Sequence, residues 1–163
     1  MKPLLIGQAP GPNTLPDYPL FPAPKTSAGG RLQTMTGLSR GGYLKAFERV
    51  NIFYEYQGKS KKEDRFPVRE ARLIASSMRP LLAGRTVVLV GRNVASAFGH
   101  EEEFLEWKKV FCRRRSPAAP EQPFVANMAC LPHPSGRNPW YNAEENREAA
   151  RTFLKELTDR LPC

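Results

Sequence analysis

One short segment gathers residues that could do chemistry: residues 131–142, which read LPHPSGRNPWYN. It holds one of the two histidines of the chain, His133, between Pro132 and Pro134, and Ser135 follows. A neutral imidazole can donate a hydrogen bond to a group that develops negative charge during a reaction. Because prolines restrict the backbone before folding, we expect a stiff loop that presents His133 for such a role.

A second loop, residues 7–14 (GQAPGPNT), follows a short apolar run at residues 4–6. By itself it is compatible with any tight turn that approaches a phosphate or a base. The loop at residues 131–142 also follows an apolar run, at residues 124–130. Because loops that follow parallel strands meet at the carboxyl edge of a sheet, we expect the two loops to form one site.

The remaining pattern predicts the elements that hold these loops. Short apolar or β-branched runs predict strands at residues 4–6, 50–56, 86–90 and 124–130. Periodicity and capping residues predict helices at residues 27–37, 41–49, 67–84, 93–98 and 101–110, and a final helix with Asn142 as its N-cap. Strand and helix alternate, which predicts the α/β class: a three-layer α/β/α sandwich around a roughly four-stranded parallel sheet, in a single domain over residues 1–163.

Two of these helices have well-defined apolar faces, and two connectors are strongly charged. The helix that Pro67 opens should turn inward Ala71, Ile74, Ala75, Met78, Leu81 and Leu82. The final helix should turn inward Ala149, Phe153, Leu154 and Leu157. Residues 58–65 (GKSKKEDR) are equally compatible with a solvated loop and a DNA contact, and residues 113–115 begin a flexible basic link.

The charge balance points to a polyanionic partner. The chain has 25 basic and 16 acidic residues, a net charge of +9, and an isoelectric point near 9.8. Nucleic acid is favoured over a membrane surface, although such a charge can also serve solubility alone. No apolar run approaches the ~20 residues of a membrane span. Three widely spaced cysteines, Cys112, Cys130 and Cys163, match no metal-site spacing, so we expect a cytoplasmic monomer without metal or cofactor.

Together the two loops resemble the signature motifs of the uracil-DNA glycosylase superfamily. Residues 7–11 (GQAPG) resemble the Gly-Glu-Ala-Pro-Gly motif of its iron–sulfur class, and residues 28–32 resemble that class's Ala-Gly-x-x-Leu helix start. Residues 87–95 resemble its Leu-Gly-x-x-Ala element. Residues 133–136 (HPSG) resemble the second signature motif, in the form found in mismatch-specific members. The matches span most of the chain in the expected order.

The resemblance implies a monofunctional DNA glycosylase that flips a nucleotide and cleaves the N-glycosidic bond of a uracil-like, damaged or modified base. It implies catalytic roles for His133, which would stabilise the leaving base, and for Gln8 and Asn13, which could orient water. The implied base pocket comprises Gly7, Ala9, Pro10, Gly11, Phe21, Asn51 and Tyr54. The implied DNA contacts are Lys25, Ser27, Ser135, Gly136, Arg137, Asn138 and Trp140.

Several positions depart from the family pattern. Ala9 stands at the catalytic Asp/Asn position, and Gln8 stands where the iron–sulfur class has Glu, so no general base is evident in this motif. Tyr54 falls at the position of the asparagine that reads uracil, with Asn51 three residues earlier. Trp140 could stack on a base or simply anchor the final helix. Two alternatives therefore stay open: a catalytically altered or inactive nucleic-acid-binding protein, and an enzyme acting on free modified nucleotides.

Overall fold

The structure is a computed structural model that describes residues 1–60, 63–112 and 124–159. Its centre is a mixed five-stranded sheet in the order β2-β1-β5-β7-β6. The strands are β1 (Leu4–Gly7), β2 (Glu48–Asn51), β5 (Thr86–Val90), β6 (Lys108–Cys112) and β7 (Phe124–Leu131). The first four in spatial order run parallel, and β6 pairs antiparallel with β7. The predicted α/β class is confirmed, and the sheet has one strand more than predicted.

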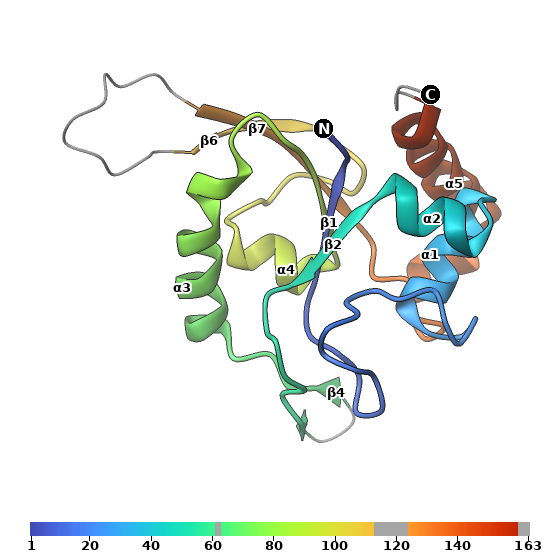
Figure 1. The fold of residues 1–163 in the computed structure, drawn as a ribbon, viewed down its shortest axis with the longest axis horizontal. Coiled ribbons are helices and arrows are strands. Elements are labelled where there is room, and N and C mark those ends of the chain that lie inside the picture. The colour runs from blue at the N-terminus through green and yellow to red at the C-terminus, as the bar shows by residue number, and fades with distance from the viewer. Residues whose placement is uncertain (61–62, 113–123, 160–163) are drawn as a thin grey trace.

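Helices cover both faces of the sheet (Figure 1). Alternate strand residues point to opposite faces, so Ile6 joins one buried cluster and Leu5 joins the other. Helices α3 (Val68–Met78) and α4 (Arg92–Ala97) supply the cluster around Ile6. Helices α1 (Ala28–Thr36), α2 (Arg40–Ala46) and α5 (Glu144–Asp159) supply the cluster around Leu5. The molecule is therefore built in three layers.

The long connection from β1 to α1 is tied to the start of α1. Ser27 is the N-cap of α1, and its hydroxyl accepts a hydrogen bond from the Gly30 amide at 3.0 Å. A Cβ atom at Gly29 would lie 2.2 Å from the Leu20 carbonyl oxygen, and one at Gly30 would lie 2.3 Å from that of Pro24. Only glycine permits so close an approach, which fixes this loop against the helix.

The helix predicted for residues 101–110 was wrong. The apolar spacing of Phe104, Trp107 and Val110 suits a helix, but β7 offers a free edge and residues 108–112 pair with it as β6. Phe104 instead forms an isolated bridge with Cys130. The strand predicted for residues 50–56 is also shifted: β2 begins at Glu48, and it ends at Asn51 because its partner β1 ends at Gly7.

Smaller corrections concern helix ends and the charged connectors. Leu81 is 75% exposed because α3 gives way to the 3-10 turn η1 (Arg79–Leu82), with Pro80 in its first turn. Asn142 is not the cap of α5 but the last residue of the 3-10 turn η2 (Pro139–Asn142). In α5 the buried alanine is Ala150, not Ala149. Residues 58–65 contain a hairpin of β3 (Lys59–Ser60) and β4 (Glu63–Asp64), and residues 113–115 lie outside the described part.

Among the described residues, none of the helices is long and apolar enough to cross a membrane. The same residues contain no group of three or more His, Cys, Asp or Glu side chains placed to hold a metal ion.

Candidate functional site

The loops that follow the parallel strands meet at one end of the sheet, the lower end of Figure 1. The amide of Gly91, just after β5, donates to the carbonyl of Leu131 at the end of β7, at 2.8 Å. The Asn93 side chain, from the first turn of α4, donates to the Gln8 side-chain oxygen at 3.3 Å. The predicted convergence of the loops after β1 and β7 is therefore carried by the loop after β5, which contacts both.

His133 lies on the loop after β7 and packs against Gly91. A Cβ atom at Gly91 would lie only 3.2 Å from the His133 Cβ atom. The carbonyl oxygen of His133 accepts two hydrogen bonds, from the Ser135 amide at 2.8 Å and from the Asn138 side-chain amide at 2.9 Å. These contacts fix the backbone that carries the imidazole, while the side chain itself still reaches solvent.

Desolvation by the surrounding protein favours the neutral form of His133. Desolvation by the surrounding protein lowers the pKa of His133 below its ordinary value of 6.5, and the charge of Asp64 partly opposes that shift. Asp64 belongs to the β3–β4 hairpin, a segment whose sequence left both a solvated loop and a DNA contact open. At pH 7 His133 is thus mostly a neutral imidazole, able to donate one hydrogen bond and to accept another.

Gln8 bridges three segments of the site. Its amide oxygen accepts from Asn93, and its amide nitrogen donates to the carbonyl of Arg65, beside the hairpin, at a long 3.5 Å. Its side chain is therefore oriented by protein groups. Asn13 is exposed further along the loop, and its side chain makes no hydrogen bond with the described residues. The structure thus ties Gln8 to the site and leaves Asn13 apart from it.

Asn51 presents a buried polar atom at the end of β2. Its side-chain oxygen has no hydrogen-bond partner among the described residues, and a Cβ atom at Gly7 would lie 2.4 Å from it. Leaving a buried acceptor unpaired costs about 1–3 kcal/mol, so this oxygen is a candidate to accept a hydrogen bond from a water molecule or ligand that reaches the end of β2. Tyr54 is 64% exposed, and its hydroxyl donates to Asp17 at 2.7 Å. Of the two candidates, Asn51 has the free group.

The rest of the predicted base pocket is mainly loop framework. Ala9 packs on the core, Pro10 is buried, and the Gly11 carbonyl accepts from the Thr14 amide at 3.0 Å. Phe21 is half-buried and makes an edge contact with the Tyr18 ring, with centroids 5.6 Å apart. These residues shape the loop after β1.

Three predicted DNA contacts have structural duties. Ser27 caps α1, as described above. The Asn138 side chain caps η2 by accepting from the Trp140 amide at 3.1 Å. Trp140 makes edge contacts with Phe104 and Tyr141, with centroids 5.8 and 4.9 Å apart, which favours the anchoring alternative. Arg137, Gly136 and Lys25 are exposed, and Ser135 is half-buried.

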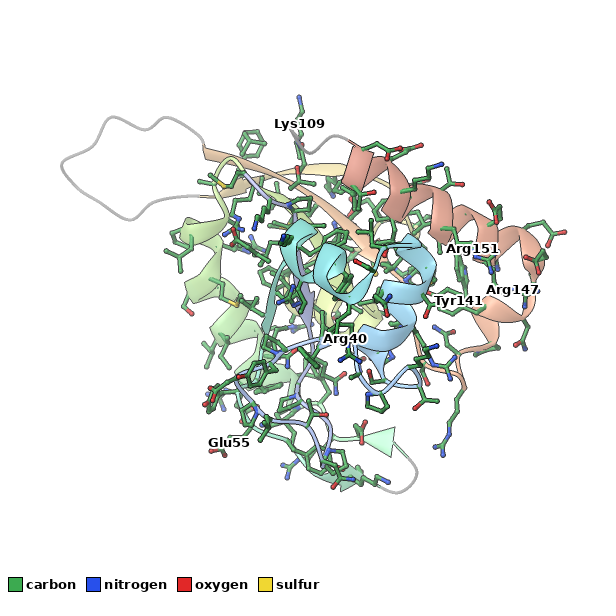
Figure 2. The ribbon with its side chains drawn as sticks, turned by 45° about the vertical axis from the view of Figure 1, so that its right-hand side comes forward. Arg40, Glu55, Lys109, Tyr141, Arg147 and Arg151 are labelled. Atoms are coloured by element: carbon green, nitrogen blue, oxygen red, sulfur yellow. The ribbon has the colours of Figure 1, made fainter. Side chains whose placement is uncertain are left out.

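A basic pocket that the sequence did not reveal is lined in part by the His133 loop. We call it the α1–α5 pocket, because it opens where α1 packs beside α5. Its volume is about 380 Å³. Its charged and loop-borne lining comprises Lys25, Arg31, Ser135, Gly136, Arg147 and Arg151. Figure 2 shows Tyr141, Arg147 and Arg151 gathered on this side of the molecule.

Comparisons with known proteins leave the family open. No protein-family model and no curated protein sequence matches the chain.

Proposed function

We propose that this protein is a monofunctional DNA glycosylase that acts on a flipped uracil-like, damaged or modified base. The observation that carries the proposal is the setting of His133: its loop is held by two hydrogen bonds at the carboxyl end of the parallel strands, the end of the sheet at which β2 also ends, with Asn51 and its unpaired side-chain oxygen. One group could stabilise charge on a leaving base, and the other could accept a hydrogen bond from that base. The net charge of +9 suits a DNA partner.

The proposed reaction requires the protein mainly to position the nucleotide and to stabilise the charge that develops on it. The C1′–N bond breaks, its electron pair stays with the base, and the sugar becomes an oxocarbenium ion. His133 donates a hydrogen bond to the base as negative charge develops there. A water molecule then adds to C1′ and loses a proton to solvent, and the departed base anion takes up a proton from solvent, which leaves an abasic site and the neutral free base.

Asp64 is the carboxylate that acts electrostatically on His133. In the proposed mechanism its negative charge would favour the positively charged sugar and compensate for the absence of an acid at Gln8 and Ala9. A side chain held by Asn93, such as that of Gln8, could orient water but could not remove its proton.

The alternative of a binding protein without catalysis has one specific observation in its favour. The first loop carries no carboxylate, and the amide of Gln8 is already hydrogen-bonded to protein groups. This alternative requires salt-dependent DNA binding without release of a base.

The test is formation of abasic sites in defined oligonucleotides. Single strands and duplexes that contain uracil, hypoxanthine, hydroxymethyluracil or another modified base would be incubated with the protein and cleaved with alkali. We expect at least one of them to be processed, and His133→Ala to lower the single-turnover rate by well over tenfold. Arg72→Gln, on the exposed face of α3, is the control and should leave the rate unchanged. A folded, DNA-binding protein that processes none of these substrates would support the binding-protein alternative.

A further inference from the structure

The α1–α5 pocket lies next to the proposed base site. Ser135 and Gly136 line it, and Ser135 is two positions after His133 in the chain. Consecutive α-carbons are about 3.8 Å apart, so the α-carbons of His133 and Ser135 are at most about 7 Å apart. Because Ser135 lines the pocket, the loop that carries the imidazole of His133 also forms part of the pocket.

Four cations from three segments line the pocket: Lys25 before α1, Arg31 in α1, and Arg147 and Arg151 in α5. No acidic residue is in its lining. Arg147 is committed to the protein, since it pairs with Glu144 and donates to the Tyr141 carbonyl at 3.0 Å. Arg147 therefore stabilises one wall of the pocket.

The other three cations keep donors available. Arg151 uses one terminal nitrogen for Glu148, at 3.2 Å, and for Glu144, at 3.5 Å. Arg31 donates from Nε to the Thr26 carbonyl at 3.2 Å, and neither Arg31 nor Lys25 has an ion pair among the described residues.

The Arg31 guanidinium lies against the loop backbone at Gly136. A Cβ atom at Gly136 would lie 2.6 Å from Arg31 Nη2. The absence of a side chain there lets the guanidinium and the loop backbone line the same space, next to the Ser135 hydroxyl. Guanidinium, ammonium and hydroxyl donors around a glycine are the groups that proteins use to bind phosphate oxygens. The pocket volume also falls within the roughly 300–1,000 Å³ of ligand pockets.

We propose that the α1–α5 pocket binds a phosphate group of a DNA strand, adjacent to the nucleotide whose base contacts His133. The proposal rests on the proposed function for the identity of that base, but its chemistry requires only a phosphate. Arg31 and Lys25 are the main anionic contacts, Arg151 adds a third, and Ser135 positions the phosphate relative to the loop.

The test is the salt dependence of binding to unmodified, fluorescently labelled oligonucleotides, so that no catalysis is needed. Arg31→Gln and Lys25→Gln would be compared with the wild type and with the Arg72→Gln control, after thermal unfolding has confirmed that each variant folds. Each pocket variant should reduce the magnitude of the negative slope of log binding constant against log salt concentration by about one, and should weaken binding several-fold. The control should change neither the slope nor the affinity. Slopes equal to that of the wild type in both pocket variants would overturn the proposal.

Competition identifies the source of the phosphate. Inorganic phosphate, a deoxynucleoside 5′-monophosphate and an unlabelled oligonucleotide would each be titrated against the labelled strand. We expect the oligonucleotide to compete at much lower concentration than either small molecule. A monophosphate that competes at micromolar concentration, with an affinity that depends on Arg31, would overturn the assignment to a DNA strand. Absence of base release from every modified oligonucleotide, together with the expected effects of Arg31→Gln and Lys25→Gln on binding, would contradict the glycosylase proposal alone.

Discussion

The side chain of His133 lies beside the backbone of Gly91, and its β-, γ- and δ2-carbons are the atoms nearest to the position that a Cβ atom at Gly91 would take. Gly91 has a φ of +103°, and a Cβ atom there would lie 3.2 Å from that of His133. This close approach couples the loop after β5 to the loop after β7. The side chain proposed to touch the base thus depends on a backbone conformation that suits glycine.

Gly91→Ala should therefore affect both stability and the site. Alanine at this φ is strained, so the free energy of unfolding should fall by about 1–3 kcal/mol, and the new methyl group should displace His133. Gly84→Ala is the matched control, because Gly84 has a φ of +74° but open space around it. We expect both variants to lose stability in chemical denaturation and only Gly91→Ala to lose base release. Equal activity of the two variants would show that the contact between Gly91 and His133 does not matter.

The two histidines should make the protein less stable in mild acid. Burial lowers the pKa of His100, and desolvation lowers that of His133, from an ordinary value of 6.5. The unfolded chain therefore binds more protons than the folded chain between the lowered values and 6.5. The free energy of unfolding should be fully retained above pH 7 and should fall as the pH drops below about 6.5. Urea unfolding at pH 7.5 and pH 5.5 measures this, with a double variant that lacks both imidazoles as the control.

Asp64 should change the pKa of His133 in a direction that titration can reveal. Its negative charge raises the pKa of His133 against the larger lowering by desolvation. Asp64→Asn should therefore lower the pKa of His133 further and leave that of His100 unchanged. NMR titration of the two imidazoles checks both values in one experiment. A pKa of His133 that stays constant or rises in the variant would contradict this electrostatic relationship.

Substitutions of Asn51 and Tyr54 should have clearly different effects on base release. Asn51→Ala removes an unpaired buried acceptor whose burial costs about 1–3 kcal/mol, so the free energy of unfolding should not fall, while base release should fall at least tenfold. Tyr54→Phe removes only a surface hydrogen bond to Asp17 and should leave the rate nearly unchanged. Single-turnover rates and denaturation curves measure the two effects. A large loss of activity in Tyr54→Phe with none in Asn51→Ala would reverse the assignment.

Trp140 should prove to be a packing residue. Trp140→Ala removes the ring contacts with Phe104 and Tyr141, and we expect a loss of roughly 2–4 kcal/mol in the free energy of unfolding. Trp140→Phe keeps an aromatic ring and should retain most of the free energy of unfolding that Trp140→Ala loses. DNA affinity of the phenylalanine variant, measured under stabilising conditions, should match that of the wild type. A stable variant that binds DNA much more weakly would instead support stacking of Trp140 on a base.

The central strands could be predicted because their composition leaves little choice. Residues 86–90 (TVVLV) are rich in β-branched residues and almost entirely apolar, which indicates a strand buried on both faces, and the apolar run at residues 4–6 indicates another. The segment around Phe104 could not be predicted, because its spacing suits a helix and only the free edge of β7 makes a strand of residues 108–112. Local pattern carries no information about a partner strand that comes later in the chain.

The site divides in a similar way. The loops that carry Gln8 and His133 could be placed at one edge from strand order alone. The free oxygen of Asn51, by contrast, depends on where β2 ends. The α1–α5 pocket depends on helix packing that brings Arg31 and Arg151 to one pocket, and Arg31 occupies only a variable position of the Ala-Gly-x-x-Leu pattern. Contacts between distant segments decide these features.

The two hydrogen bonds to the carbonyl of His133 bear on the kinetics of recognition. Because Ser135 and Asn138 hold that carbonyl, the loop has little conformational entropy left to lose when a ligand arrives. Such a loop would accept a base in one step and would not remodel itself around a poor fit. Discrimination among bases would then appear in dissociation rates rather than in association rates, and the range of accepted bases would be set by shape.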